Sequence, residues 1–350
     1  MLQNSVTRQQ EQQEIEALPG PYLLFLGDTT EPGYAKTAYG LRDWAPERCL
    51  GEFYCQGATV STGLPFLTPA QAVAAGAKSL VIGVANAGGH IPASWLLSLV
   101  QAMEAGLDII SGMHVRLGSI AVLRDSAARF GRKLIDVRQP PANINVGTGR
   151  PRSGRRLLTV GTDCALGKKY AALALARAFK RRGADADFRA TGQTGIMIAG
   201  SGMPMDAVVS DFAAGAAEML SPDAADDHWD VIEGQGSLFH PAYAGVALAL
   251  LHGSQPDVIV VCHQPGREVV LGHPSFRLPS IEETMALALQ LGQRTNPSIR
   301  CAGVCLNTSG MDEVEANRLL ASESERLGLP VADPMRGGAM FERLVDSCLA

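Results

Sequence analysis

Short apolar runs alternate with amphipathic segments along most of the chain. In the first half, this pattern predicts strands at 22–26, 80–84, 108–110 and 134–137, and helices at 35–41 and 93–105. Strands that alternate with helices are typical of βαβ units, in which neighbouring strands run parallel. The first half is therefore predicted to be an α/β domain with a largely parallel sheet.

The alternation is more regular in the second half. There it predicts strands at 157–160, 187–189, 230–232, 258–262 and 301–306, and helices at 168–182, 208–220, 312–327 and 340–349. Several of these strands are continuously apolar, as expected for central strands that are covered on both faces of a parallel sheet. The second half is therefore predicted to be another α/β domain.

A stretch without periodicity separates the two halves. Residues 139–154 contain three prolines and three glycines, a composition typical of a domain boundary. We therefore expect four segments along the chain. They are an N-terminal arm at 1–20, a first domain at 21–140, a linker at 141–155 and a second domain at 156–350.

Composition narrows the classes of function. Apolar residues make up 46% of the 350 residues, and the net charge of −5 argues against a general nucleic-acid surface. A local pocket on an acidic protein can still bind a small anion. The polar N-terminus does not resemble a signal peptide, and no run reaches the roughly 18 apolar residues of a membrane span. The seven cysteines show no C-x-x-C spacing. We expect a cytoplasmic protein that binds neither nucleic acid nor membrane, with a homo-oligomer left open.

The most specific motif follows the strand predicted at 157–160. Residues 161–169 read GTDCALGKK, and the next helix is predicted to begin at once. Glycines let several backbone N–H groups face one anion, the helix N-terminus adds its dipole, and Lys168 adds a charge. This order predicts a phosphate-binding loop. Its candidate cofactor-binding residues are Gly161, Thr162, Asp163, Ala165, Leu166, Gly167, Lys168 and Lys169.

This loop departs from the usual G-x4-G-K-[ST] pattern in two ways. One extra residue separates its glycines, and Lys169 stands where Ser or Thr is usual. That hydroxyl normally ligates Mg²⁺ beside the β- and γ-phosphates, and lysine cannot replace it because an ammonium has no acceptor. A second cation favours a highly anionic ligand that needs no metal, so we expect no obligatory metal here.

Three segments of the second half resemble dethiobiotin synthetase-like P-loop enzymes. They are GTDCALGK at 161–168, DVIEG at 230–234 and GVCLN at 303–307. The resemblance implies a strand-end acid at Glu233 and an asparagine, Asn307, that contacts the base of the cofactor. It also keeps an ATP-dependent ligase or kinase open as an alternative function.

A second resemblance covers almost the whole chain. It rests on PYLLFLGD, AGAKSLVIGVANAGG, ATGQTGIMIAG, IEGQGSLFHPAYAGV and LLHGSQPD, which are similar to segments of one bacterial and archaeal family. The resemblance implies a Rossmann-like N-terminal domain and a P-loop NTPase-like C-terminal domain. Characterised members of that family are N-acetyltransferases of D-amino acids, notably D-glutamate, and they use acetyl-CoA. The same activity, in D-amino-acid catabolism, is therefore expected here.

Acetyl transfer to an amine needs a general base and donors for the tetrahedral oxyanion. Glu233 is predicted to follow a central strand, at the edge where open α/β sheets bind ligands. A structural carboxylate that caps a turn is the alternative. His240 and His263 are further candidates for the base, although a lone histidine is more often a hydrogen-bonded structural residue.

Two polar turns and one arginine are candidates for binding the amino acid, which we expect to lie between the domains. Arg267 is suited to a bidentate pair with a carboxylate, unless it is a solvated surface residue. The candidate substrate-binding residues are Asn86, Gly88, Gly192, Gln193, Thr194 and Arg267. A protein that senses a nucleotide or coenzyme A without catalysis is a third interpretation of these loops.

Overall fold

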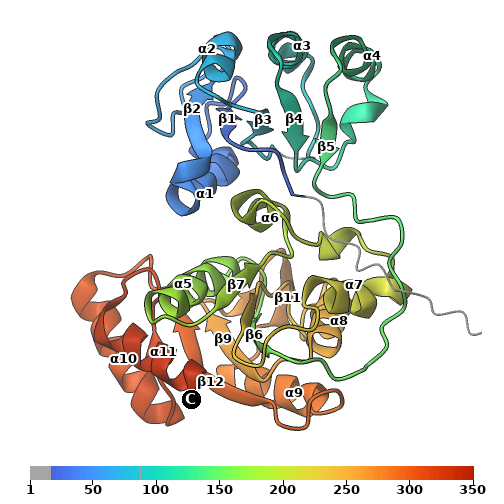
Figure 1. Ribbon diagram of the computed structural model, residues 1–350. Coiled ribbons are helices and arrows are strands. Elements are labelled where there is room, and N and C mark those ends of the chain that lie inside the picture. Colours follow the sequence, from blue (N-terminus) through green and yellow to red (C-terminus); the bar gives the residue numbers. More distant parts are fainter. Residues whose placement is uncertain (1–16, 87) are drawn as a thin grey trace, which may run out of the picture.

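The computed structural model describes residues 17–86 and 88–350. They form two α/β bodies, one from each half of the chain (Figure 1). Residues 1–16 of the expected N-terminal arm lie outside the described residues. Among the helices of the described residues, none has the length and hydropathy that crossing a membrane requires. The predicted α/β class with mainly parallel sheets is confirmed.

The N-terminal body is built on a five-stranded parallel sheet with the order β2-β1-β3-β4-β5. Its strands are β1 (Tyr22–Phe25), β2 (Cys49–Phe53), β3 (Ser79–Ile82), β4 (Asp108–Ser111) and β5 (Leu134–Asp136). The strand order reverses direction between β1 and β3. In doubly wound sheets, ligands bind outside the carboxyl ends of the strands at such a point.

Four α-helices of the described residues accompany this sheet. They are α1 (Lys36–Trp44), α2 (Pro69–Ala74), α3 (Leu96–Ala105) and α4 (Ala121–Phe130). Helix α2 begins with a capping box between Thr68 and Gln71, and α3 ends at Gly106 in the left-handed conformation. Helices α2, α3 and α4 cover the outer side, whereas α1 lies toward the second body (Figure 1).

The C-terminal body is built on a six-stranded parallel sheet with the order β13-β12-β9-β6-β8-β7. Its strands are β6 (Arg155–Gly161), β7 (Ala186–Arg189), β8 (Trp229–Ile232), β9 (Val258–His263), β12 (Arg300–Leu306) and β13 (Val331–Ala332). Strands β8 and β9 are buried nearly throughout, as expected of central strands covered on both faces.

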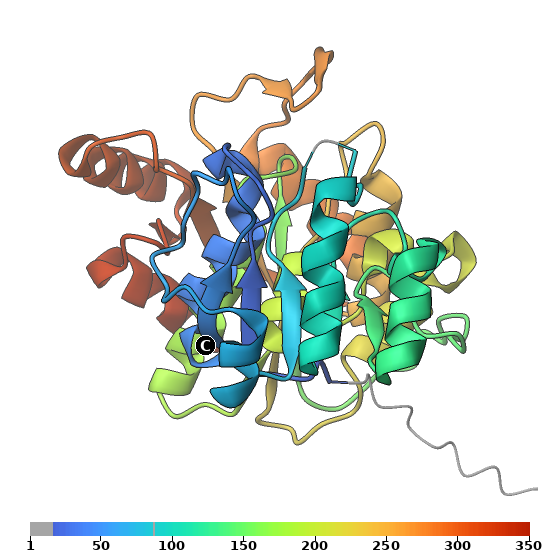
Figure 2. The ribbon, with the colours of Figure 1, turned by 90° about the horizontal axis from the view of Figure 1, so that it is seen from above.

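Seven α-helices belong to this second half. They are α5 (Lys168–Arg181), α6 (Gln193–Ala199), α7 (Ala213–Leu220), α8 (Ala244–Ser254), α9 (Ile281–Gly292), α10 (Glu313–Leu327) and α11 (Gly338–Leu349), all within the described residues. A short antiparallel hairpin, β10 (Val269–Val270) and β11 (His273–Arg277), follows β9. The hairpin projects beyond the rest of the chain at the top of Figure 2.

Some elements differ from the sequence-based expectation. The helix expected at 208–220 begins only at Ala213, because Ser210–Phe212 forms a tight 3-10 turn before it. Strand β2 was not predicted, since Gly51 and Glu52 interrupt its apolar pattern. Glycine is required at position 51 because a Cβ atom there would lie 2.6 Å from the carbonyl oxygen of Pro65.

The two bodies share part of one hydrophobic core. The N-terminal core includes Ile196 and Met197 of α6, and Trp44 packs against the cores of both bodies. The hydroxyls of Thr37 and Thr194 lie 3.1 Å apart across the boundary. An apolar interface of this kind limits relative domain motion. Groups on α1 and α6 therefore hold a defined position relative to the P-loop.

Candidate active site

The predicted phosphate loop connects β6 to α5. Ala165 and Gly167 both have a positive φ, of 54° and 104°, which curls the backbone. The backbone N–H groups of 165–169 donate to no acceptor in the part of the chain that the structure describes. Lys168 is buried, and its Nζ donates to the carbonyl oxygen of Asp163 at 2.6 Å. The loop therefore offers several free donors and one ammonium group to an anion.

Asp163 anchors this loop. Its carboxylate is fully buried and accepts hydrogen bonds from Arg267 Nη1 at 3.0 Å and from the backbone N–H of Leu271 at 2.8 Å. Arg267 also donates to the carbonyl oxygen of Cys164 and to Gln264 Oε1. The expected role of Arg267 as a clamp for a substrate carboxylate does not match this geometry. The guanidinium is engaged because the buried charge of Asp163 requires a partner.

Glu233 follows β8 directly and is 4% exposed. Its Oε2 accepts hydrogen bonds from the backbone N–H groups of Thr191 at 3.0 Å and Gly192 at 3.1 Å. Its Oε1 accepts no hydrogen bond from the described residues and is accessible to solvent. Burial raises the pKa of this carboxyl group, while the two N–H groups and the charge of Lys169 oppose the rise. One oxygen is thus held in place and the other is available.

Gly195 lets α6 approach this carboxylate. A Cβ atom at position 195 would lie 2.3 Å from Glu233 Oε2, so a larger residue would displace the acid. Gln193 Oε1 accepts a hydrogen bond from Arg138 Nε at 3.2 Å, and Thr194 bonds Thr37. The predicted residues Gly192, Gln193 and Thr194 therefore lie between Glu233 and the N-terminal body. Arg138, which also pairs with Asp206, was not predicted.

The charges of Lys169 and Glu233 act on each other, and the Lys169 ammonium lies over an aromatic ring. Its Nζ is 4.5 Å from the ring centroid of Tyr170. Burial lowers the pKa of the ammonium, and the charge of Glu233 opposes this shift. The ammonium forms no hydrogen bond or ion pair with any residue that the structure describes. A cation in this state attracts an anionic ligand.

The two candidate histidines differ in the role that their surroundings allow. His240 is buried, and its Nδ1 accepts hydrogen bonds from the N–H groups of Ala242 and Tyr243 at 3.0 and 3.2 Å. Burial lowers its pKa. In the neutral ring the proton must therefore sit on Nε2, which makes that nitrogen a donor. This geometry does not favour His240 as a base.

His263 ends β9, and its Nδ1 lies 3.0 Å from Thr162 Oγ1. Burial lowers its pKa, so the ring is neutral near pH 7. His263 lines cavities beside Pro265 and Ser280. No hydrogen bond or ion pair joins His263 to Glu233 or His240 among the described residues. The three predicted catalytic side chains are therefore not joined to one another by hydrogen bonds, and a shared catalytic role stays a prediction.

The other predicted substrate loop lies in the N-terminal body. The side chain of Asn86 closes its own turn, because Nδ2 donates to the carbonyl oxygen of His90 at 3.0 Å and Oδ1 accepts from the His90 N–H at 3.1 Å. Gly88 has a φ of 82° and is exposed. Among the described residues, no hydrogen bond joins Asn86 or Gly88 to the second body, so their part in binding stays a prediction.

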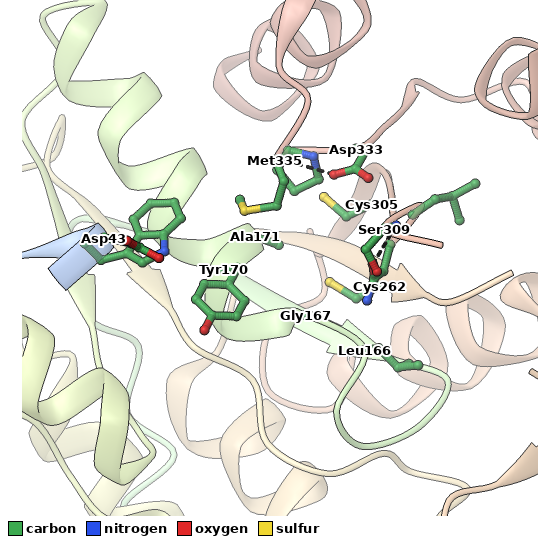
Figure 3. Close-up of a pocket in the computed structure, with 14 residues that line it drawn as sticks. Asp43, Leu166, Gly167, Tyr170, Ala171, Cys262, Cys305, Ser309, Asp333 and Met335 are labelled. Atoms are coloured by element: carbon green, nitrogen blue, oxygen red, sulfur yellow. Dashed lines mark hydrogen bonds between the residues drawn. The ribbon is translucent and has the colours of Figure 1, made fainter. Parts of the chain in front are cut away.

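A cavity of about 320 Å³ opens beside the start of α5. Trp44 and Tyr170 line it together with Cys262, Cys305 and the predicted Asn307. Figure 3 shows Asp43 and Tyr170 on one side of the cavity, with Cys262, Cys305 and Ser309 on the other. Its size is in the usual range for small-molecule sites. The cavity adjoins the phosphate loop, since Leu166 and Gly167 also line it.

The sequence analysis missed several residues of this cavity. Trp44 comes from the end of α1, and Asp333, Pro334 and Met335 come from the turn after β13. A tryptophan among polar residues at a helix end, and a proline two residues after a short strand, were the available signals. Neither signal points to the phosphate loop until the fold brings these segments together.

One group of side chains has the spacing of metal ligands. The ligand atoms of Asp163, Cys164 and His240 lie within 4.8 Å of one another. The carboxylate of Asp163 already accepts a hydrogen bond from Arg267, and burial raises the pKa of the Cys164 thiol. Because Nδ1 of His240 accepts hydrogen bonds, Nε2 carries the proton of the neutral ring. A metal ion on Nε2 of His240 would require the ring proton on Nδ1, where it would face the N–H groups of Ala242 and Tyr243, so His240 is poorly placed as a ligand.

Both halves of the chain match known protein families. The second half matches the family model described as a domain of unknown function (DUF1611_C), P-loop domain, over residues 145–345. The first half matches the domain of unknown function (DUF1611_N), Rossmann-like domain, over residues 53–140. The predicted pairing of a Rossmann-like domain with a P-loop domain is therefore confirmed.

Three relatives match nearly the whole chain. A D-glutamate N-acetyltransferase from Tritonibacter scottomollicae is 49% identical over 330 residues, covering 94% of this chain and 98% of the relative. A D-glutamate N-acetyltransferase from a Pseudoalteromonas species is 46% identical over 332 residues, with the same two coverages. The crystal structure of a DUF1611 family protein from Anabaena variabilis has a TM-score of 0.81 at 33% identity, covering 93% of this chain and 98% of that chain. The chain belongs to the DUF1611 family.

Proposed function

We propose that this chain transfers an acetyl group from acetyl-CoA to the amino group of D-glutamate. The names of two relatives that are 46–49% identical over 94% of the chain support this reaction. One structural observation supports it most directly. Glu233 is a buried carboxylate with one oxygen held by two N–H groups and the other available, and it lies beside the charge of Lys169.

The phosphate loop supports coenzyme A as the carrier of the acyl group. Coenzyme A has a pyrophosphate and a 3′-phosphate, which match the free N–H groups of 165–169 and two lysines. Lys169 replaces the hydroxyl that would ligate Mg²⁺ in an ATP-hydrolysing P-loop. The loop thus favours a ligand that is bound through its phosphates and reacts elsewhere.

Glu233 is the proposed general base. As the amine nitrogen bonds the acetyl carbon, Glu233 Oε1 accepts the proton that the nitrogen loses. The carbon–sulfur bond then breaks, and the thiolate sulfur takes up the proton that Glu233 accepted, which gives free coenzyme A and restores the carboxylate. A raised pKa suits this role, because a stronger base accepts the proton more readily.

A thiol-release assay tests this function. The purified chain is incubated with acetyl-CoA and D-glutamate, free thiol is measured, and N-acetyl-D-glutamate is identified by mass. EDTA is expected to leave the rate unchanged, since Lys169 takes the place of the metal-binding hydroxyl. L-glutamate serves as the stereochemical control.

A parallel arm measures hydrolysis of Mg·ATP, because the phosphate loop and Glu233 also resemble those of ATP-dependent ligases. Amino-acid-dependent thiol release with little ATP hydrolysis supports the acetyltransferase. ATP hydrolysis without thiol release would overturn it in favour of the ligase or kinase.

A further inference from the structure

A residue of the N-terminal body forms one wall of the cavity beside the phosphate loop. Trp44, the last residue of α1, lines this cavity together with Tyr170 of α5. The two rings are stacked, with centroids 5.9 Å apart and an interplanar angle of 29°. The guanidinium of Arg177 lies 4.2 Å from the centroid of the Trp44 ring system, and Arg177 Nη2 donates to the carbonyl oxygen of Trp44 at 2.5 Å. The indole is therefore held in place by α5.

The indole N–H of Trp44 has no protein acceptor within the described residues. Trp95 differs in this respect, because its Nε1 donates to Asp28 Oδ1 at 2.7 Å. Tryptophan N–H groups usually find a hydrogen-bond partner when buried. Trp44 is half-buried and lines a cavity, so the part of its ring that Tyr170 and Arg177 leave uncovered, and its donor, can face a ligand there.

The remaining walls combine apolar surface with a polar edge. Met335 lines the cavity while 52% exposed, and Pro334 lies beside it. Asn307 Oδ1 accepts a hydrogen bond from the Ser309 N–H at 3.2 Å, which leaves the Asn307 Nδ2 group as a donor. A flat ring with nitrogen acceptors at its edge fits these features.

We propose that Trp44 of the N-terminal body recognises the adenine ring of the acyl carrier in this cavity, where the resemblance to dethiobiotin synthetase-like enzymes already implies, through Asn307, that a cofactor base binds. The position supports this, because Leu166 and Gly167 of the phosphate loop line the same cavity, so a base held here has its phosphates over the loop. The inference rests on the proposed function only in taking coenzyme A as the carrier. Recognition of the carrier then requires both bodies of the chain.

A titration with adenosine 3′,5′-bisphosphate tests the proposal without any turnover. This probe has the base and the 3′-phosphate of coenzyme A but no thioester. Stacking of a base on an aromatic side chain corresponds to about 5- to 150-fold in affinity. We expect Trp44→Leu to weaken binding of the probe to the full chain within this range, and Trp44→Phe to restore most of it.

Two further measurements separate recognition from a merely structural role. Trp44→Leu should raise the KM for acetyl-CoA by the same factor as the Kd of the probe, with a smaller change for S-acetylpantetheine, which has no adenine. Because Trp44 packs on both cores, Met335→Ala is the second variant. Met335 is exposed on another wall of the cavity, so its truncation should weaken the probe without lowering Tm.

Several outcomes would overturn the proposal. They are no binding of the probe to the wild type, binding that neither variant weakens, or an equal rise in KM for both acyl donors. If the chain transfers acetyl groups but binds the probe equally well without Trp44, the role of Trp44 is wrong and the proposed function stands. If binding of the probe depends on Trp44 but no acetyl group is transferred, the role of Trp44 stands and the proposed function is wrong.

Discussion

Two buried glutamates, one from each body, have different hydrogen-bonding surroundings. Glu52 in β2 is 2% exposed, and both of its oxygens are occupied. Oε1 accepts from Ser61 Oγ at 2.5 Å, and Oε2 accepts from the N–H and Oγ1 of Thr62 at 2.6 and 2.5 Å. Glu233 after β8 is 4% exposed, and only its Oε2 is occupied.

The difference shows that burial alone does not identify a catalytic acid. A buried carboxylate with all its acceptors filled organises a loop, whereas one with an available oxygen can accept a proton. Glu233 also lies near Lys168 and Lys169, whose charges act on it. Both oxygens of the N-terminal acid are thus engaged by its own loop, whereas the P-loop body leaves one oxygen of its acid available.

The largest expected effect comes from Glu233→Gln. The amide keeps an oxygen for the N–H groups of Thr191 and Gly192 but cannot accept a proton. Loss of a general base lowers kcat by about 10²- to 10⁴-fold. Steady-state kinetics with D-glutamate check this, and circular dichroism verifies the fold. A kcat within threefold of the wild type would exclude Glu233 as the base.

The pH profile sharpens the same assignment. The base must be deprotonated, so kcat falls as the pH drops through the pKa of Glu233. Burial raises that pKa, so the fall is expected at a higher pH than the value of about 4.3 for an ordinary glutamate. The residual activity of Glu233→Gln should lack this acid limb. An unchanged limb in the variant would assign it to another group.

Lys168→Ala is expected to have the next largest effect. A charge-assisted hydrogen bond contributes about 1.5–3 kcal/mol, so the KM for acetyl-CoA should rise about 10- to 100-fold. The KM for D-glutamate should change less. Lys180→Ala is the matched control, because Lys180 lies near the other end of α5 and is exposed. Equal effects of both variants would contradict a specific role of the loop.

Glu52→Gln should act on stability and leave catalysis intact. The amide group replaces an acceptor in a buried site, so one of the donors on Ser61 and Thr62 loses its partner. An unsatisfied buried polar group costs about 1–3 kcal/mol, which urea unfolding measures. The kcat of the folded variant should match that of the wild type. A large loss of kcat would mean that the N-terminal acid takes part in catalysis.

Thr37→Val should have the smallest effect. It removes the hydrogen bond to Thr194 across the boundary between the bodies, and a typical hydrogen bond contributes about 0.5–1.5 kcal/mol. Thermal unfolding and the KM for D-glutamate check it together. Lower stability with an unchanged KM assigns a structural role to this contact. A higher KM at unchanged stability would instead place Thr194 against the amino acid.

Much of the P-loop body could be predicted from the sequence because its signals are local. The strand, glycine-rich turn and helix around Lys168 lie within the 27 consecutive residues 155–181. The acid at Glu233 was predicted because it follows a short apolar strand. Strand β2 and the late start of α7 were not predictable, because a close backbone approach at Gly51 and a 3-10 turn before Ala213 decide them.

The assignments of single side chains were less predictable. Arg267 was expected to hold a substrate carboxylate, and it instead pairs with Asp163, about 100 residues earlier in the chain. His240 was expected as a base, and its Nδ1 is engaged by two N–H groups of its own loop. The sequence shows that a group is present, but not which neighbour occupies it.

By itself, the sequence determined the two α/β halves, the phosphate loop and the acid at the end of β8, because apolar periodicity and loop chemistry act over short distances. Tertiary structure alone decided that α6 joins the core of the N-terminal body, that one oxygen of Glu233 stays available, and that Trp44 lines a cavity of the P-loop body. These features depend on packing between segments that are more than 40 residues apart, and in the two contacts between the bodies more than 100, and no local pattern encodes such contacts.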